Sequence, residues 1–388
     1  MKRALMALAL VGLLSGCQTV TQTVTGWYDD IFTTGSKKTL PAALIEFKPS
    51  ADVRLRVSAN IGGAGSFVFS PALNKDGLFA TGFDGKLARY DADTLKERWR
   101  VEAGKKLSGG VGAADNVVVV GTQKGEVLAF DYAGQALWQA RVSSEILSPP
   151  QVAAGLVLVR SGDGRIFALD AKDGKRKWLY QRATPALTVR SFGGLVADKN
   201  ALFAGFGGGK LVALELENGN VGWEASVALP RGVSELERIA DVTSNAVIDG
   251  RMVCAVAFQG RVACFEIQSG NVIWARELSS IAGLAMDARN LYVSDVNGAV
   301  HALDKNTGGY VWKQDKLAHR QLSTPLIYRG YVVVGDLQGY VHFISREDGA
   351  FAARIATDGS PIRAQPQALT DGVLVQTKNG GLFVLGLN

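Results

Sequence analysis

Two cysteines are the residues whose type and spacing most directly suggest chemistry. Cys254 and Cys264 lie in two apolar runs on either side of the turn Phe258-Gln259-Gly260. If that turn has three residues, the two side chains face each other across a hairpin, and an oxidising compartment permits a disulfide between them. A register shifted by one residue would point them apart. The alternative is a pair of small, buried apolar side chains.

The other candidate reactive groups do not assemble into a recognisable site. Residues 205–211 look like a phosphate-binding loop, but Leu211 stands where Ser or Thr would hold Mg²⁺. The sequence contains neither a nucleophile elbow nor a paired-histidine metal motif. The histidines, none of them near the cysteine pair in sequence, are His301, His319 and His342. We therefore expect no catalytic residue, no metal site and no cofactor.

The third cysteine ends a short N-terminal signal. Lys2-Arg3 precedes an apolar stretch from Ala4 to Leu14, which is too short to span a membrane and is typical of a secretory signal. The stretch closes with Leu14-Ser15-Gly16-Cys17, which resembles the bacterial lipoprotein signal. That resemblance implies removal of residues 1–16 and acylation of Cys17. The residue after the cysteine is not Asp, which in such lipoproteins implies passage to the outer membrane.

The segment after Cys17 separates the signal from the folded part. Residues 18–45 show no helix or strand period long enough for a domain, so we expect residues 17–47 to form a lipidated tether. The formal charge is +6, but Lys and Arg are scattered over turns, unlike the single basic face of nucleic-acid-binding proteins. No apolar span approaches the ~18 residues of a transmembrane helix. The composition favours a soluble domain on an anchor.

The elements that carry these residues belong to an internal repeat. Each copy has an aliphatic run, a glycine and an alternating segment, which together read as a β-hairpin whose glycine supplies positive φ in the turn. Successive glycines are 38 to 51 residues apart, the spacing of four-stranded propeller blades. The eight starts are Gly85, Gly125, Gly164, Gly209, Gly260, Gly298, Gly339 and Gly380. We predict an all-β, eight-bladed β-propeller of four-stranded antiparallel blades.

A tryptophan recurs near the end of six copies, commonly four residues after a loop glycine, as in Gly174 and Trp178. A ring buries about 150–250 Å², so at this position it can seal one blade against the next. Packing therefore explains these residues better than ligand stacking. The six are Trp99, Trp138, Trp178, Trp223, Trp274 and Trp312. The seventh copy has Ala353 at this position.

The eighth copy ends too early to supply its own fourth strand. Residues 53–57 align with the strand around Trp99, placing Leu55 where the tryptophan stands. We predict that this N-terminal strand completes the last blade and closes the ring, which removes the exposed edges of an open array. Residues 48–388 would then form one closed propeller domain.

The repeat, with Ala-Leu-Asp, a glycine and then tryptophan, resembles that of the quinoprotein dehydrogenases. Those enzymes carry adjacent cysteines over a quinone, a calcium site and, in some, a haem motif, and this chain lacks vicinal cysteines and a haem motif. The resemblance therefore implies the propeller without the cofactor. A periplasmic ligand-binding protein or quinoprotein-like enzyme that uses the central channel is the alternative function.

The lipoprotein signal, tether and eight blades together resemble the BamB (YfgL) family of the outer-membrane β-barrel assembly complex. This implies a non-catalytic scaffold on the periplasmic face of the outer membrane that binds the POTRA domains of BamA, with other complex subunits and unfolded outer-membrane proteins as further partners. Two segments carry the implied site: Pro185-Ala-Leu-Thr-Val-Arg-Ser191 and Glu237-Arg-Ile-Ala-Asp-Val-Thr243. The implied contacts are Leu187, Val189, Arg190 and Asp241, with Thr243 where the family has a second Asp.

The repeat spacing supports the same two segments independently of the resemblance. The copies that contain them are lengthened to 45 and 51 residues, and extra length in one repeat maps to a loop on one face, often the binding face. Leu187 and Val189 beside Arg190 would form a small apolar centre with a charged donor, which interface hot spots favour. The alternative is two ordinary inter-blade loops with Leu187 turned inward.

Overall fold

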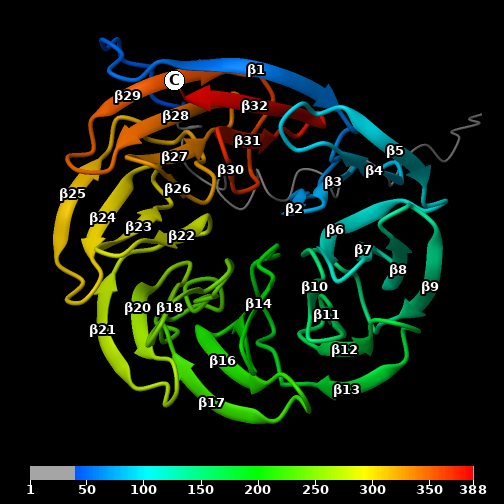
Figure 1. Cartoon of the computed structure of the whole chain (residues 1–388). Helices are drawn as coiled ribbons and strands as arrows, with labels where there is room; N and C mark the ends of the chain where they lie inside the picture. The colour runs from blue at the N-terminus through cyan, green and yellow to red at the C-terminus, as the bar shows by residue number, and fades with distance from the viewer. Residues whose placement is uncertain (1–39, 388) are drawn as a thin grey trace, which may run out of the picture. The chain divides into compact units, whose positions relative to one another are not determined.

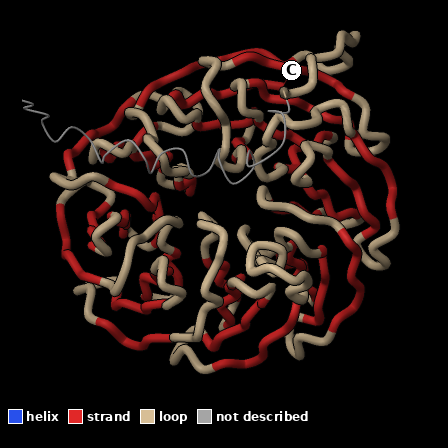
Figure 2. The backbone as a smooth tube through the Cα atoms, turned by 180° about the vertical axis from the view of Figure 1, so that it is seen from behind, coloured by secondary structure: helices blue, strands red, loops and turns tan. Residues whose placement is uncertain are grey.

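The described part of the chain is a ring of β-sheets. The computed structural model describes residues 40–387, and every regular element among them is a β-strand. Eight four-stranded antiparallel sheets follow one another around a central axis, with the first strand of a blade nearest the axis and the last outermost (Figure 1). Figure 2 shows the same ring from behind. The predicted eight-bladed propeller is confirmed.

Seven blades are built from four consecutive strands, and the eighth is not. Blades 1 to 4 are β2 (Ala72–Asn74), β3 (Gly77–Thr81), β4 (Lys86–Tyr90) and β5 (Glu97–Glu102); β6 (Leu107–Ala114), β7 (Val117–Thr122), β8 (Glu126–Asp131) and β9 (Ala136–Arg141); β10 (Gln151–Ala153), β11 (Leu156–Arg160), β12 (Ile166–Asp170) and β13 (Arg176–Tyr180); β14 (Leu195–Asp198), β15 (Ala201–Phe206), β16 (Lys210–Glu215) and β17 (Val221–Ser226). Blades 5 to 7 are β18 (Val247–Asp249), β19 (Met252–Val256), β20 (Arg261–Glu266) and β21 (Val272–Glu277); β22 (Gly283–Met286), β23 (Asn290–Ser294), β24 (Val300–Asp304) and β25 (Tyr310–Gln314); β26 (Leu326–Tyr328), β27 (Tyr331–Gly335), β28 (Tyr340–Ser345) and β29 (Phe351–Ala356). Blade 8 combines β30 (Gln367–Leu369), β31 (Gly372–Gln376) and β32 (Gly381–Leu387) with β1 (Val53–Asn60).

The burial of a strand follows its position in the blade. In blade 2 the second strand, β7, is buried along its whole length, whereas the outermost strand, β9, alternates between exposed and half-buried positions. A strand covered on both faces needs apolar residues at every position, and one covered on a single face needs them only at alternate positions. This difference accounts for the continuous aliphatic runs and the weaker alternation of the outer strands.

The turns between the second and third strands match the prediction in seven blades. Seven of the eight repeat glycines have positive φ: Gly85, Gly125, Gly164, Gly209, Gly298, Gly339 and Gly380. Gly260 is the exception, because Gln259 takes the left-handed conformation there, with φ of 48°. A Cβ atom on Gly260 would lie 2.5 Å from that of Ala228. Close approach of the neighbouring connection, and not φ, requires glycine at this position.

Each of the six tryptophans forms a hydrogen bond from its own blade to the next one. The indole Nε1 of Trp178 donates to the backbone oxygen of Leu216 at 3.0 Å, and the ring covers Gly219, where a Cβ would lie 2.6 Å from Cε3. The other acceptors are the carbonyls of Tyr132, Ala171, Ile267, Lys305 and Arg346, at 2.7–3.0 Å from Trp99, Trp138, Trp223, Trp274 and Trp312 respectively. The predicted packing role is confirmed.

Side-chain volume is exchanged across the strands where the tryptophan is missing. In five blades the residue paired with the tryptophan is Ala or Cys: Ala129, Ala168, Ala213, Cys264 and Ala302. In blade 7 the pair is reversed, because Phe343 on β28 is opposite Ala353 on β29. Phe343 is fully buried, so the volume that the outer strand lacks comes from the inner one.

The ring closes between the two ends of the described chain. β1 pairs antiparallel with β32 from Val53 opposite Leu387 to Asn60 opposite Gly381, as Figure 1 shows where the blue and red strands run side by side. The predicted closure by an N-terminal strand is confirmed. Leu55 does not act as a tryptophan substitute, however, because it is 48% exposed and lies at a register irregularity.

The chain already contacts the propeller before the predicted boundary at residue 48. The backbone N–H of Ala42 donates to the oxygen of Ala318 at 2.9 Å, and Phe47 stacks on Phe351 with ring centroids 5.4 Å apart. Residues 41–47, which we expected to belong to the tether, therefore pack on blades 6 and 7. The lipoprotein signal and the remaining tether lie outside the described residues.

A buried polar network supports blade 7. The Arg320 Nε donates to Asp336 Oδ2 at 2.7 Å, and His342 Nε2 lies 2.9 Å from the same oxygen. Arg354 Nε donates to His342 Nδ1 at 3.3 Å, so the hydrogen of this histidine is on Nε2 and is donated to Asp336. Burial lowers the pKa of His342 below its ordinary value of 6.5, against the raising effect of Asp336. The neutral form of His342 therefore belongs to the folded state.

We expect Trp178→Ala to lower the free energy of unfolding by about 3–5 kcal/mol, because it leaves a cavity between blades 3 and 4. Trp178→Phe retains most of the apolar ring and loses the hydrogen bond to Leu216, so its loss should be near 1 kcal/mol plus a packing term. Chemical denaturation of both variants measures this difference. A cost below about 1 kcal/mol for the alanine variant would contradict the sealing role.

The pKa of His342 predicts a pH dependence of stability. Because the folded-state pKa is lowered, the unfolded chain binds more protons than the folded chain at this residue as the pH falls below about 6.5, so stability falls with falling pH, by at most about 1.4 kcal/mol per pH unit. His342→Asn cannot bind the proton and should show a shallower slope. Urea unfolding of both proteins between pH 5 and 7.5 tests this, and equal slopes would show that His342 protonates in the native state.

Candidate functional site

The two lengthened loops lie on one face of the propeller for a topological reason. Residues 181–194 connect β13 to β14, and residues 227–246 connect β17 to β18. In a four-stranded antiparallel blade, the connection to the next blade leaves from the end that carries the hairpin between strands two and three. Both loops therefore share a face with the glycine turns, including residues 207–209 between β15 and β16.

Asp241 ties the two loops and a glycine turn together. Its Oδ2 accepts a hydrogen bond from the Val189 backbone N–H at 2.6 Å, and its Oδ1 accepts one from that of Gly208 at 2.9 Å. The residue is only 3% exposed. Burial raises the pKa of the Asp241 carboxyl, although the two backbone donors and the charge of Arg160 act in the opposite direction. The structure thus places Asp241 beneath the 181–194 loop.

Further hydrogen bonds join the same loops next to Asp241. The Ser191 hydroxyl donates to the backbone oxygen of Thr243 at 2.9 Å, and the Gly194 N–H donates to Asn245 Oδ1 at 2.6 Å. Thr243 is buried, and its own hydroxyl donates to the oxygen of Ile281 in the next inter-blade connection at 3.2 Å. Thr243 therefore acts as a link between loops of the protein.

Arg190 reaches away from its own loop to two other inter-blade connections. Its Nη2 donates to Glu145 Oε2 at 2.9 Å, and both side chains remain about one-third exposed. The guanidinium carbon also lies 5.5 Å from the ring centroid of Phe67, in the connection between blades 8 and 1. Arg190 is therefore held at the surface by an ion pair and an aromatic face, with part of its charge accessible.

The loops enclose a cavity of about 260 Å³, whose lining includes Glu145, Arg160, Val189, Arg190, Phe206 and Asp241. Arg160 packs 5.1 Å from the Phe206 ring centroid, and its Nη1 donates to the Gly193 oxygen at 3.3 Å. Burial lowers the pKa of Arg160 to about 10. The charged groups are thus engaged in holding the loops.

Leu187 lies on the outer surface of the first loop. Its side chain is 44% exposed, whereas Val189 is half-buried because its backbone is drawn towards Asp241. The structure therefore brings together the four implied contact residues in two layers. Leu187 and Arg190 present accessible atoms, while Val189 and Asp241 hold the loop. An inward-turned Leu187, the alternative considered from the sequence, does not occur.

Sequence reasoning missed three exposed apolar side chains in the second loop. Leu229, Val233 and Leu236 are 56%, 99% and 63% exposed. The carboxylate of Glu237 accepts hydrogen bonds from the backbone N–H groups of Val233 and Ser234 at 2.9 and 3.0 Å, which shapes the loop tip. Apolar residues between the charged residues of an inter-blade loop were the signal that could have identified this surface.

The cysteine pair lies away from this cavity, in blade 5. Cys254 and Cys264 are direct register partners on β19 and β20, and their sulfur atoms form a disulfide at 1.97 Å. Both are fully buried in the cluster that contains Trp274. Of the two arrangements open from the sequence, the structure has the bonded one. The site of Cys17 lies outside the described residues.

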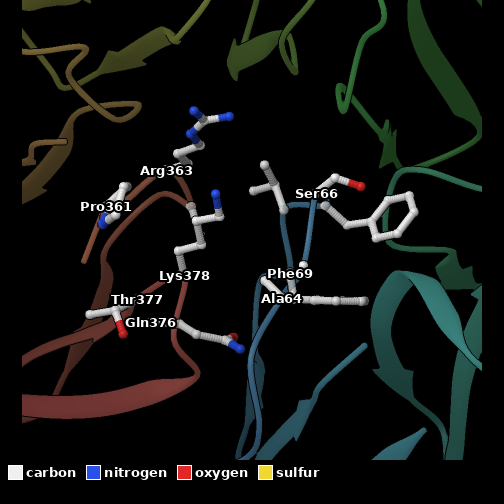
Figure 3. A pocket seen from close by; sticks show the side chains of 12 residues that line it. Ala64, Ser66, Phe69, Pro361, Arg363, Gln376, Thr377 and Lys378 are labelled. Atoms are coloured by element: carbon white, nitrogen blue, oxygen red, sulfur yellow. The ribbon is translucent and has the colours of Figure 1, made fainter. Parts of the chain in front are cut away.

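A second, smaller cavity lies at the closing blades. A cavity of about 30 Å³ lies between residues 64–69 and residues 361–364 and 376–378 (Figure 3). Figure 3 shows Arg363 and Lys378 on one side and Ser66 on the other. A space of this size accommodates water. Within residues 40–387, no group of three His, Cys, Asp or Glu side chains is placed to hold a metal ion.

Comparisons with known proteins converge on one family. The family model described as "Outer membrane protein assembly factor BamB" matches residues 83–314 and 296–386. A protein of that description from Nitrosomonas eutropha is 47% identical over 383 residues, or 98% of this chain and 94% of the relative. The crystal structure of BamB from Moraxella catarrhalis matches 86% of this chain and 100% of its own, with a TM-score of 0.80 and 26% identity.

A quinohemoprotein alcohol dehydrogenase from Comamonas testosteroni also has a similar structure. Its TM-score is 0.71, with 14% identity over 87% of this chain and 76% of that chain. At this identity the likeness shows the propeller fold alone. It agrees with the repeat pattern, which resembles that of quinoproteins, without extending to their cofactor chemistry.

We expect Asp241→Asn to loosen the 181–194 loop. The asparagine amide would direct N–H groups at one of the two backbone donors, so one buried hydrogen bond is lost and stability falls by about 1–3 kcal/mol. Hydrogen exchange at the Val189 and Gly208 amides should accelerate, while exchange in blades 1 and 6 stays unchanged. Asp115→Asn, at an exposed turn, is the matched control. Unchanged exchange at both amides would show that Asp241 does not hold the loop.

Proposed function

The chain belongs to the BamB family of outer membrane protein assembly factors, and from that premise we propose that it is a scaffold that docks on the POTRA domains of BamA. Its role lies in outer-membrane protein assembly, and like its relatives it is not an enzyme. The docking surface in this proposal comprises the loops at residues 181–194 and 227–246, with Leu187 and Arg190 as the contacts.

One observation carries this proposal: the buried carboxylate of Asp241 fixes the loop that presents Leu187. Because Asp241 binds the Val189 N–H at 2.6 Å, the neighbouring apolar side chain is exposed on a loop that is already ordered. Binding then costs little additional conformational entropy, which favours affinity. An apolar side chain beside a partly exposed arginine is the composition that interface hot spots favour.

The second loop extends the proposed surface. Leu229, Val233 and Leu236 add exposed apolar area to the loop that contains Asp241. Singly exposed apolar residues are ordinary, but several on one loop mark a contact surface. We include them as secondary contacts for the same partner, or for the unfolded outer-membrane proteins and other subunits that the complex brings together.

The place of action in this proposal is the periplasmic face of the outer membrane. An acylated Cys17 would anchor the chain, and residues 48–388 would form the soluble propeller. The disulfide between Cys254 and Cys264 supports an oxidising compartment, where such bonds persist. Within residues 40–387 no helix has the length and apolar character needed to cross a bilayer.

We expect Arg190→Glu to weaken binding to the purified POTRA domains at least about tenfold, because it reverses a charge at the contact. Leu187→Asp should have a similar effect through loss of the apolar anchor. Isothermal titration calorimetry with the Cys17→Ser protein measures both. Lys175→Glu, an equally drastic reversal at an exposed turn on the opposite face, is the control and should bind as the parent does.

A second control separates Arg190 as a contact from Arg190 as part of the protein's own ion pair. Glu145→Gln removes the pair and leaves the arginine charge available to a partner. Retained binding in Glu145→Gln with lost binding in Arg190→Glu supports direct contact. If a folded Arg190→Glu protein binds normally, Arg190 is not in the interface, and if the parent protein fails to bind, POTRA docking itself is wrong.

A further inference from the structure

The segment that precedes β1 is bound to blade 7 as an extended peptide. In addition to the Ala42 bond to Ala318, the backbone N–H groups of Ser50 and Ala51 donate to the oxygen of Ala352 at 2.9 and 3.2 Å. Figure 1 shows the blue start of the described chain beside β29. Residues 41–51 therefore follow the outer edge of blade 7 before the chain enters β1.

Two arginines of the propeller bind the main chain of this segment. Arg320 Nη1 donates to the backbone oxygen of Ala42 at 2.9 Å. Arg354 Nη1 donates to that of Ile45 at 3.0 Å. Both bonds have a charged donor, so each is stronger than an ordinary amide hydrogen bond. The two contacts are three residues apart and hold the peptide in one register.

Aromatic packing adds a side-chain contact to these main-chain bonds. Phe47 stacks on Phe351 with centroids 5.4 Å apart and an interplanar angle of 28°. The Arg354 guanidinium carbon lies 5.0 Å from the Phe47 centroid and 5.4 Å from that of Phe351. Leu44 also packs against the buried cluster between blades 6 and 7. The apolar residues of the segment thus have dedicated partners.

The two arginines that bind the segment are themselves held in place by other side chains of blade 7. Arg320 is only 2% exposed, and its Nη2 donates to Gln338 Oε1 at 2.7 Å in addition to the bond with Asp336. Arg354 is oriented by the neutral His342. Donors whose rotamers are locked by a second layer of hydrogen bonds form a preorganised site.

Blade 7 differs from the other blades where the segment binds. Its outer strand, β29, begins with three buried residues, Phe351 to Ala353, whereas outer strands such as β9 and β25 begin with two exposed ones. It is also the blade in which Ala353 replaces the sealing tryptophan. The bound segment therefore packs on the start of this outer strand, at positions that other blades leave exposed.

We propose that the blade-7 clasp, defined as Arg320, Phe351 and Arg354, fixes the point at which the N-terminal chain leaves the propeller. This rests on the proposed anchor at Cys17, because the exit point then limits how far the propeller can stand from the membrane. Releasing residues 41–47 would lengthen the chain between Cys17 and the propeller by up to about 25 Å, at ~3.5 Å per residue. The clasp thus sets the reach of the lipid anchor.

The position of the clasp also determines which side of the propeller is attached to the N-terminal chain. The proposed docking loops connect blade 3 to blade 4 and blade 4 to blade 5, while the clasp is on blade 7 of an eight-bladed ring. Figure 1 shows β29 and the strands β14 and β17 on opposite sides of the ring. A chain held at blade 7 therefore attaches the propeller on the side away from its docking loops.

Distance measurement between two spin labels tests the clasp. Cysteines replace the exposed residues Ala43 and Glu347 in the full chain with Cys17→Ser, so that one label reports the segment and the other the propeller. We expect a narrow distance distribution in this parent and a broad one with Arg354→Gln. Arg346→Gln, on the same blade, should leave it narrow. A broad distribution in the parent, or a narrow one with Arg354→Gln, would overturn the proposal.

A second variant protects the test against a folding defect in blade 7. Phe47→Ala acts from the side of the segment and leaves every propeller residue in place. Hydrogen exchange at the Ala42 amide should accelerate at least about tenfold in Phe47→Ala, while β27 and β28 remain protected. An unchanged rate in a variant with an intact propeller would count against the clasp.

The stand-off from the membrane and docking on the partner are measured separately. Lipidated protein in phosphatidylglycerol-containing vesicles carries a donor dye at Glu347, and the bilayer carries the acceptor dye. Energy transfer between them should fall in Phe47→Ala. An unchanged signal would refute the idea that the clasp limits the distance between the propeller and the membrane. Binding of the same variants in solution to the POTRA domains should stay at the parent value. Loss of POTRA binding by the parent would instead refute the proposed function and leave the clasp result standing.

Discussion

The propeller depends on one repeated interaction, the hydrogen bond from a tryptophan in six of its eight outer strands to the backbone of the following blade. A blade cannot bury both of its faces alone, so its stability comes from its neighbours. At six junctions the indole ring covers a glycine and its N–H satisfies a carbonyl at 2.7–3.0 Å. The glycine is required because a side chain there would occupy the space of the ring. The two residues form one structural unit shared between consecutive blades.

The junctions without tryptophan show how the ring tolerates exceptions. In blade 7 the missing volume is supplied by Phe343, and the outer edge is covered by the segment that contains Phe47. Blade 8 has no tryptophan either, and its outer strand is β1, which Arg100 of blade 1 contacts through the oxygen of Asn60 at 3.2 Å. Both exceptions flank the closing seam. The regular part of the ring, from blade 1 to blade 6, is also the part that carries the proposed docking loops.

The sequence predicts the fold almost completely because the same pattern of residues recurs in successive copies of the repeat. Eight glycines, six tryptophans and the incomplete last copy are sufficient to infer blade number and closure. The site is less accessible to such reasoning. Loop length indicates where it lies, but the division between exposed Leu187 and buried Asp241 depends on hydrogen bonds across 52 residues of sequence, which no local pattern contains. The clasp is even harder to predict from the sequence, since Arg320 and Ala42 are 278 residues apart in the chain.

The closing strand pair also determines at which stage of folding the ring can close. Val53 and Leu387 lie about 330 residues apart, and joining the ends of such a long loop costs about 5 kcal/mol of chain entropy beyond a constant. Blades 1 to 7 contain only neighbouring strands and can form as the chain emerges, since local contacts form quickly. β32 follows all of these strands in the sequence, so its pairing with β1 comes after them. Without β32 the ring would be an open arc with unpaired edges on β1 and β31, so the closed form of the entire propeller depends on this one strand.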